Sequence, residues 1–231
     1  MGTGRLAEVS DIVAAVNIFL KEGPLNGRHI LITAGPTWEA LDPVRYIANR
    51  SSGKQGYAIA SSLAKLGAKV TLVSGPTALS APQGVNLIPV ESARDMYDAC
   101  EASLPADAAI CVAAVADWRP ASSEPIKVKK NGGEPPVLNL VENPDILASL
   151  SNHKTRPQLV IGFAAETNDV VTYAQAKRER KGCDWIMAND VSGDVTGGDQ
   201  NTVHIISKDA VTRWNEMPKS QVADQLAQEI V

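Results

Sequence analysis

The segment 48–56, with the sequence ANRSSGKQG, combines side chains that can bind an anion. Small hydroxyl residues precede what we expect to be a helix, and a helix start presents free backbone N–H groups to negative charge. The segment departs from the Walker A pattern, because Ala48 and Gln55 stand where that pattern requires Gly and Ser or Thr. We therefore expect an anion site of another design, with a plain helix cap as the alternative. The candidate residues are Ser51, Ser52, Gly53 and Lys54.

Arg45 and Asn49, which precede Ser51 in the chain, favour an anion-binding site over a plain helix cap. A helix cap needs neither a cation nor an amide before it, whereas a planar guanidinium suits phosphate or carboxylate. The turn TAGPT, 33–37, follows an apolar run and offers a glycine for close backbone approach and a threonine hydroxyl. Such a turn often does no more than reverse the chain. Its candidate residues are Gly35, Pro36 and Thr37.

Two further segments carry charge. AAVADWRP, 113–120, places Asp117 and Arg119 after an apolar run, where the carboxylate is suited to hold Mg²⁺ or a base edge. A helix cap or a surface ion pair is the alternative. IKVKKNGG, 126–133, indicates either a solvated loop or a flap whose ammonium groups close onto a triphosphate. Its lysines are Lys127, Lys129 and Lys130.

Nothing in the sequence indicates nucleophilic catalysis. It contains no G-x-S-x-G motif, and no cysteine stands beside a plausible base. Cys111 lies in an apolar run, where we expect it to be buried and inert. Catalysis by positioning and charge neutralisation is the better expectation.

These segments must be positioned by alternating strands and helices. Apolar runs predict strands over 29–33, 69–74, 108–115, 159–163, 185–188 and 203–206. Residues 137–141 are a further candidate strand. Periodic patterns predict helices over 57–66, 92–104, 169–180 and 220–231, with a start near Pro144 and a short helix over 8–20. This alternation predicts an α/β fold, a doubly wound, Rossmann-like, mostly parallel sheet with helices on both faces. The candidate loops would then share the edge at the strand C-termini.

Composition narrows the class of protein. The chain has 231 residues and a formal charge of −4, which gives no reason to expect a nucleic-acid partner. The basic group near residues 177–181 is interpreted as the solvated end of a helix. Its 3 cysteines form no disulfide framework, and the longest apolar run is too short to cross a membrane. We expect a cytoplasmic protein with no zinc site.

Taken together, the motifs resemble a known family. TAGPTWEALDPVRYIANRSSGKQGYAIA, AAVADWRP followed by KVKK, ENPDIL, and GFAAET with a later AND are similar in order to bacterial phosphopantothenate–cysteine ligases. Those enzymes form the C-terminal half of a bifunctional coenzyme A biosynthesis flavoprotein. The resemblance implies a ligase domain over 28–231, preceded over 1–27 by a linker from a decarboxylase domain. One position departs from the pattern: Trp38 stands where several relatives have a basic residue, so we assign it no substrate role.

The resemblance implies a reaction and a set of roles. CTP would activate the carboxylate of 4′-phosphopantothenate as an acyl-cytidylate, with Mg²⁺, and the amine of L-cysteine would then displace CMP. Asn49 would act in turnover of the intermediate, Lys127 in its formation, and Arg45 on the substrate phosphate. Relatives form homodimers that share their sites. The implied nucleotide contacts are Gly35, Pro36, Thr37, Ser51, Ser52, Gly53, Lys54, Ala113, Ala114, Asp117, Lys127, Lys130 and Phe163, with Asp117 near the metal.

Two other functions remain open from the residues alone. An NAD(P)-dependent oxidoreductase could use the same sheet, although G-x-G-x-x-G is missing and the second strand ends in Val73-Ser74-Gly75 rather than an acidic residue. A non-catalytic nucleotide-binding regulator is the other alternative.

Overall fold

The computed structural model describes residues 9, 23–129, 132, 137–166, 168–190 and 200–231. The helix predicted over 8–20 lies outside this part of the chain, apart from Val9. Eight strands form one sheet in the order β13-β12-β10-β9-β6-β1-β4-β5. Their bounds are β1 (His29–Ala34), β4 (Lys69–Ser74), β5 (Val85–Pro89), β6 (Ala108–Cys111), β9 (Leu159–Glu166), β10 (Trp185–Asp190), β12 (Val203–Ile206) and β13 (Val211–Arg213).

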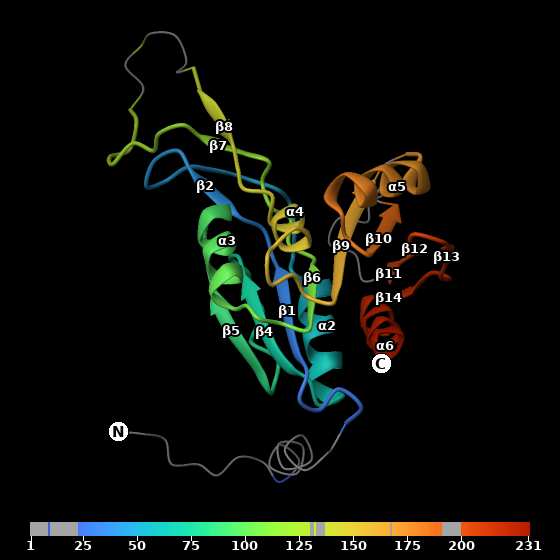
Figure 1. Cartoon of the computed structure of the whole chain (residues 1–231). Helices are drawn as coiled ribbons and strands as arrows, with labels where there is room; N and C mark the ends of the chain where they lie inside the picture. The colour runs from blue at the N-terminus through green and yellow to red at the C-terminus, as the bar shows by residue number, and fades with distance from the viewer. Residues whose placement is uncertain (1–8, 10–22, 130–131, 133–136, 167, 191–199) are drawn as a thin grey trace.

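The six strands from β10 to β5 are parallel, and β12 and β13 add an antiparallel edge. Helices cover both faces, as Figure 1 shows. On one face lie α2 (Lys54–Lys65) and α6 (Lys219–Ile230); on the other lie α3 (Ala93–Ala102), α4 (Ile146–Ser151) and α5 (Val170–Lys181). The predicted doubly wound, mostly parallel architecture is confirmed.

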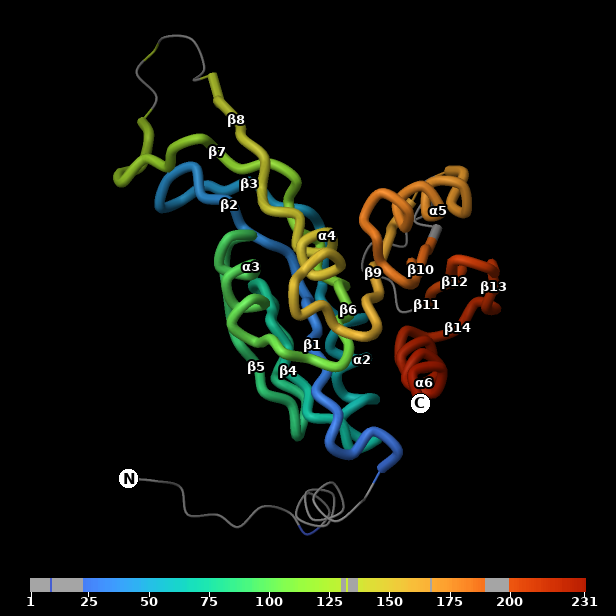
Figure 2. Tube along the Cα trace, viewed as in Figure 1, coloured from blue at the N-terminus to red at the C-terminus, as the bar shows by residue number. Residues whose placement is uncertain are grey.

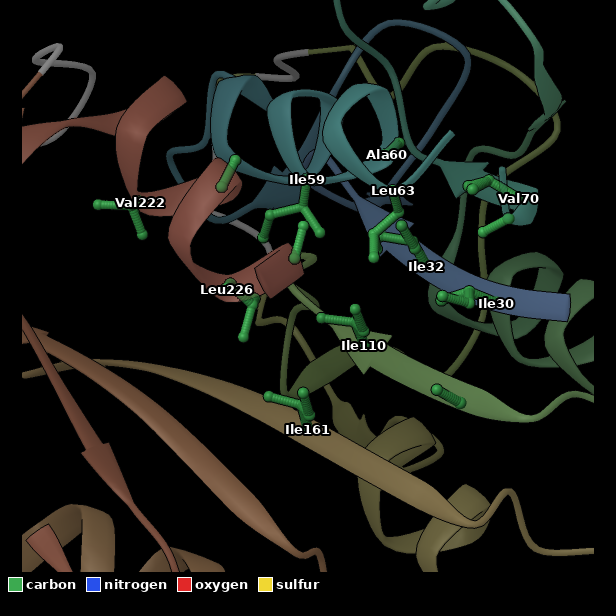
Figure 3. Packing of buried hydrophobic residues seen from close by; sticks show 14 of the residues in the cluster. Ile30, Ile32, Ile59, Ala60, Leu63, Val70, Ile110, Ile161, Val222 and Leu226 are labelled. Carbon is green, nitrogen blue, oxygen red and sulfur yellow. The ribbon is translucent and has the colours of Figure 1, made fainter. Parts of the chain in front are cut away.

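The central strands are apolar in sequence because helices bury both of their faces. In β1, Ile30 and Ile32 belong to the cluster formed with α2 and α6, whereas Leu31 belongs to the cluster under α3 and α4. Figure 3 shows how Ile59 and Leu63 of α2 approach β1 from one side. Leu25, four residues before β1, is also part of this core.

Strand order reverses direction next to β1. The chain passes from β1 through α2 to β4 on one side, and later returns through α3 to β6 on the other. The loops that follow β1 and β6 therefore diverge at the same edge, which in open α/β sheets is the usual ligand-binding crevice. Segments 35–53 and 112–117 meet at this switch point.

Small two-stranded sheets extend from this edge, where Figure 2 traces them beyond the main sheet. They are β2 (Trp38–Ala40) with β3 (Tyr46–Ala48), and β7 (Trp118–Pro120) with β8 (Leu140–Glu142). A third pair joins β11 (Gln200–Asn201) to β14 (Met217–Pro218) beside α6. The rings of Trp38 and Tyr46 stack across the first pair, 4.3 Å between centroids. Buried Glu39 accepts a 3.0 Å hydrogen bond from Ala93 N, which fixes the pair against the start of α3.

Several predicted boundaries were wrong. The third strand ends at Cys111 rather than at residue 115, because the chain leaves the sheet ladder there. Beyond Cys111, an isolated β-bridge joins Ala114 to Pro36. β8 lies at Leu140–Glu142 rather than over 137–141, because its bounds are set by antiparallel pairing with β7. The short strands β2, β3, β5, β7, β11, β13 and β14 were not predicted, since two to five residues carry too little periodicity.

Gly56 sets the distance between α2 and β1. A Cβ atom at this position would lie 2.6 Å from the Cβ of Ala34. We expect Gly56→Ala to lower the free energy of unfolding by about 1–3 kcal/mol through overpacking. Helix propensity alone would raise it by about 1 kcal/mol, so the sign of the change separates the two effects. Urea unfolding gives the value, with exposed Lys65→Ala in the same helix as the control; a more stable Gly56→Ala variant would contradict the close approach.

Candidate functional site

A cavity of about 980 Å³ opens at the switch point, beyond the C-terminal ends of β1, β6, β9 and β10. Its walls come from four regions: the segment before α2, the loop after β6, the loop before α4, and one side of α5. The predicted site residues that line it are Gly35, Asn49, Ser51, Ser52, Gly53, Lys54, Ala113, Ala114, Asp117 and Phe163. The structure thus brings together three of the loops that the sequence singled out.

The N-terminus of α2 forms part of this wall without a side-chain cap. Its N-cap residue Gly53 has φ 74° and makes no capping hydrogen bond. The nearby Ser51 Oγ accepts instead from the Gly53 N–H, at 3.3 Å. The interpretation of ANRSSGKQG as an ordinary helix cap is therefore wrong. A helix start that lacks a cap and lines a cavity offers its N–H groups and partial positive charge to an anion.

Hydrogen bonds join the loops that follow β1 and β6. Asn49 Nδ2 donates to the Val115 carbonyl at 2.9 Å, and the N–H of Ala114 donates to the Gly35 carbonyl at 2.9 Å. The Thr37 hydroxyl oxygen accepts from Ala116 N at 3.0 Å. Asn49 is therefore held at the cavity by one end of its amide, at the junction of the two loops.

Two lysines of α5 line the cavity. Lys177 Nζ donates to the Phe163 carbonyl at 2.9 Å, and burial lowers the pKa of its ammonium group, with Glu166 opposing the shift. Lys181 forms an ion pair with Asp145. The interpretation of this group as a solvated helix end was wrong for Lys177, because the sequence does not show that α5 turns this side toward the end of β9.

The acidic side of the cavity is organised around Asn143. Its Nδ2 donates to the Ala116 carbonyl at 2.8 Å, and its backbone N–H donates to the Asp117 carbonyl at 2.9 Å. The Asp117 side chain is exposed and lines the cavity. Within the described ranges, no three His, Cys, Asp or Glu side chains gather as a metal-binding group. Asp117 is thus a candidate ligand that is not part of a preformed metal centre among the described residues.

Other predicted residues lie away from the cavity wall. Pro36 and Thr37 are buried beside it, and Lys127 is exposed on the lysine segment itself. Lys130 lies outside the described residues. The roles predicted for these residues therefore stay predictions.

Arg45 takes part in a network that the sequence did not suggest. Its Nε and Nη2 donate to Asp42 Oδ2 at 2.9 and 2.5 Å, and Nη2 also donates to the Val128 carbonyl at 2.7 Å. The N–H of Val128 donates to the same carboxylate at 3.2 Å, and the N–H groups of Val44 and Arg45 donate to Oδ1. Buried Asp42 thereby fastens the lysine segment 126–129 to the turn before β3.

These contacts control the charge of Asp42. The Arg45 guanidinium, assisted by the backbone N–H groups, holds the pKa of the carboxyl well below its usual range, although desolvation opposes the shift. The network is local in sequence except for Val128. An Asp-x-x-Arg spacing before a strand is the signal that would have indicated it.

The fold and the cavity define an α/β protein with a large cavity at the switch point of a parallel sheet. Residues 25–231 match the family described as the DNA/pantothenate metabolism flavoprotein C-terminal domain, and the chain belongs to this family. The family expected from the motifs is thereby confirmed. No helix in the described part of the chain is long and apolar enough to span a membrane.

Its relatives include bifunctional proteins. The coenzyme A biosynthesis bifunctional protein CoaBC of Vibrio parahaemolyticus is 49% identical over 203 residues, 87% of this chain and 51% of the relative. CoaBC of Haemophilus influenzae is 44% identical over 234 residues, 100% of this chain and 58% of the relative. The crystal structure of a CoaBC C-terminal domain has a TM-score of 0.76 at 42% identity, covering 89% of this chain and 95% of that chain. The chain spans about half the length of these two relatives.

The Asp42 network predicts a pH-dependent contribution to stability. Because the folded-state pKa is depressed, the stabilisation is present above the ordinary carboxyl pKa of about 3.9 and is lost as the pH falls toward the folded-state value. We expect Asp42→Asn to lower the free energy of unfolding at pH 7, and the deficit to shrink below about pH 5. Urea titrations at several pH values measure this. Exposed Asp209→Asn serves as the control, and a deficit that stays constant with pH would contradict the account.

Proposed function

We propose that this chain is a ligase that joins 4′-phosphopantothenate to L-cysteine with CTP as the activating nucleotide. The observation that carries the proposal is one cavity that combines the uncapped start of α2 with Lys177 and Lys181. Such a site suits a polyanion. Membership of the family, and the coenzyme A biosynthesis named for its relatives, support the assignment of substrate. The choice of CTP over ATP rests on the lysine segment that contains Lys127, because this segment resembles that of the bacterial enzymes.

The reaction needs donors and cations rather than a protein nucleophile. In the first step the pantothenate carboxylate attacks the α-phosphorus of CTP, and pyrophosphate leaves. In the second the cysteine amine attacks the acyl carbon and loses a proton, while CMP leaves with the electron pair of the acyl–oxygen bond. The thiol at the cavity, Cys111, has its pKa raised to about 12, chiefly by burial, so it is protonated at neutral pH and unsuited to attack.

We assign the side chains roles that their positions support. The N-terminus of α2, with Ser51, Ser52 and Lys54, would bind phosphates, and the two lysines of α5 would neutralise further charge. Asn49 would hold the acyl-cytidylate for the amine, because its amide stands where the loops of β1 and β6 join. Lys127 would assist formation of the intermediate, and Arg45 would contact the substrate phosphate. The backbone of Ala113 and Ala114 and the ring of Phe163 would line the nucleotide.

The donors present fit Mg²⁺ brought in by the nucleotide. Mg²⁺ commonly uses one or two carboxylates together with substrate phosphates, and Asp117 is an exposed carboxylate on the cavity wall. When bound there, the ion would neutralise phosphate charge. The side chains themselves would position the triphosphate.

We also propose a homodimer in which a second copy covers the arm formed by β2, β3, β7 and β8. Exposed apolar side chains gather on the arm and the segments beside it, which is unusual for a free surface. These include Val44, Tyr46, Trp118, Ile126, Val128, Leu140 and Val141. A decarboxylase domain linked to the N-terminal side fits the bifunctional relatives, of which this chain matches about half.

Pyrophosphate release tests the proposed function. Incubation with CTP, Mg²⁺, 4′-phosphopantothenate and L-cysteine should release pyrophosphate and CMP in equal amounts, and ATP should replace CTP poorly. Coupled detection of pyrophosphate measures turnover, with a known ligase as the positive control. No pyrophosphate in a working assay would rule the ligase out, and CTP binding without turnover would favour the nucleotide-binding regulator.

Substitutions at Asn49 and Lys127 should separate the two steps. We expect Lys127→Gln to slow formation of the acyl-cytidylate by about 100-fold, because it removes a cation from the charged transition state. Asn49→Asp should instead form the intermediate and accumulate it. Quenched reactions resolved by mass spectrometry distinguish these results. Lys65→Ala, exposed at the far end of α2, serves as the control. Accumulation of the intermediate in the Lys127 variant would show the assignment of roles to be incorrect.

A further inference from the structure

One end of the cavity is lined by side-chain amides whose oxygens face no donor. Gln55 Oε1 and Asn201 Oδ1 are both buried, and neither accepts a hydrogen bond from any residue in the described part of the chain. Asn201 is only 5% exposed, and both side chains line the cavity. A buried carbonyl oxygen without a donor is costly, so such a group in a native fold calls for a partner.

The local structure fixes these amides in place. Gln55 Nε2 donates to the Lys219 carbonyl at 3.2 Å, which commits the nitrogen end of the amide and leaves its oxygen without a donor among the described residues. Asn201 pairs with Met217 in the ladder of β11 and β14, two residues before Lys219. The first turn of α2, the strand β11 and the first turn of α6 therefore converge on one place. Asn189, at the end of β10, lines the same cavity.

The chemistry of this cluster selects its ligand. Amide oxygens require a hydrogen-bond donor, whereas phosphates and carboxylates carry only acceptors when ionised. A divalent metal is disfavoured, because hard cations are held by carboxylates and none of the three amides carries a charge. A primary amine or ammonium group offers two or three N–H donors and suits the cluster.

The position of the cluster identifies which amine. Gln55 is the second residue of α2, so a donor held there lies beside the N–H groups proposed to bind phosphate. The attacking amine must approach the acyl carbon, which in the acyl-cytidylate is bonded through oxygen to the phosphate of CMP. An amine on the nucleobase, by contrast, is separated from the phosphates by the ribose. We propose that Gln55 and Asn201, with Asn189 at its edge, form the subsite that binds the amino group of the amino-acid substrate. This inference rests on the proposed ligase function and adds to it a binding site for the nucleophile.

The two half-reactions provide the test. A pyrophosphate burst with CTP and 4′-phosphopantothenate alone reports acyl-cytidylate formation, which does not use the amine. CMP release at varied L-cysteine gives the KM for the amino acid. We expect Asn201→Leu and Gln55→Met, both close in shape to the native side chains, each to raise this KM at least tenfold. Asn201→Asp, which keeps an acceptor, should hold the KM near the wild-type value.

Matched controls make the result specific. Gln200→Leu changes the exposed neighbour on β11, outside the cavity lining, and should leave the KM for cysteine unchanged. The two test positions lie on different elements, so if thermal unfolding shows that one variant is misfolded, the other decides. The inference is overturned if the KM for cysteine is unchanged while the burst is normal. It is also overturned if the KM for CTP, 4′-phosphopantothenate or Mg²⁺ rises in its place.

Failure of the function itself is distinguishable from failure of this subsite. If the wild-type chain gives no burst, the ligase proposal falls, and the amine subsite falls with it. If the wild-type burst and turnover are normal and the amide variants bind cysteine as well as wild type does, only the subsite falls.

Discussion

The close contact between α2 and β1 is the constraint on which the site depends. Gly56 has no side chain, so the first turn of the helix can lie directly against Ala34 at the end of the strand. That contact places the uncapped N–H groups of α2 at the switch point, where the loops of β1 and β6 diverge. A bulkier residue would move the helix start away from the cavity. The same contact therefore serves the packing of the core and the position of the proposed anion site.

Polar groups divide the cavity into regions of different chemistry. Backbone N–H groups and the lysines of α5 supply positive potential, which suits phosphates. The amide oxygens of Gln55 and Asn201 supply acceptors at another part of the wall, where a donor is needed. A reaction between an activated acid and an amine requires both regions in one enclosure. The cavity provides this because its walls come from strands and helices far apart in sequence.

The lysine segment is attached by a buried carboxylate rather than by apolar packing. Asp42 accepts hydrogen bonds from Arg45 and from the backbone of Val128, so the segment is held at the residue that follows Lys127 while its side chains remain exposed. Arg45 is therefore engaged within the protein. A role on substrate phosphate would require its guanidinium to use the N–H groups that these contacts leave over.

The sequence by itself determined the fold class and the edge of the sheet where the candidate loops meet, because apolar periodicity and turn residues are local signals. The family followed from the resemblance of its ordered motifs. The segments 48–56 and 113–117 were recognised for the same reason. The tertiary structure alone decided that Lys177 lines the cavity, that Asp42 binds Val128, and that Gln55 binds the carbonyl of Lys219. Each of these is a contact between residues distant in the chain. Their spacing in sequence holds no information about it, since parallel pairing and helix packing bring them together only in the folded protein.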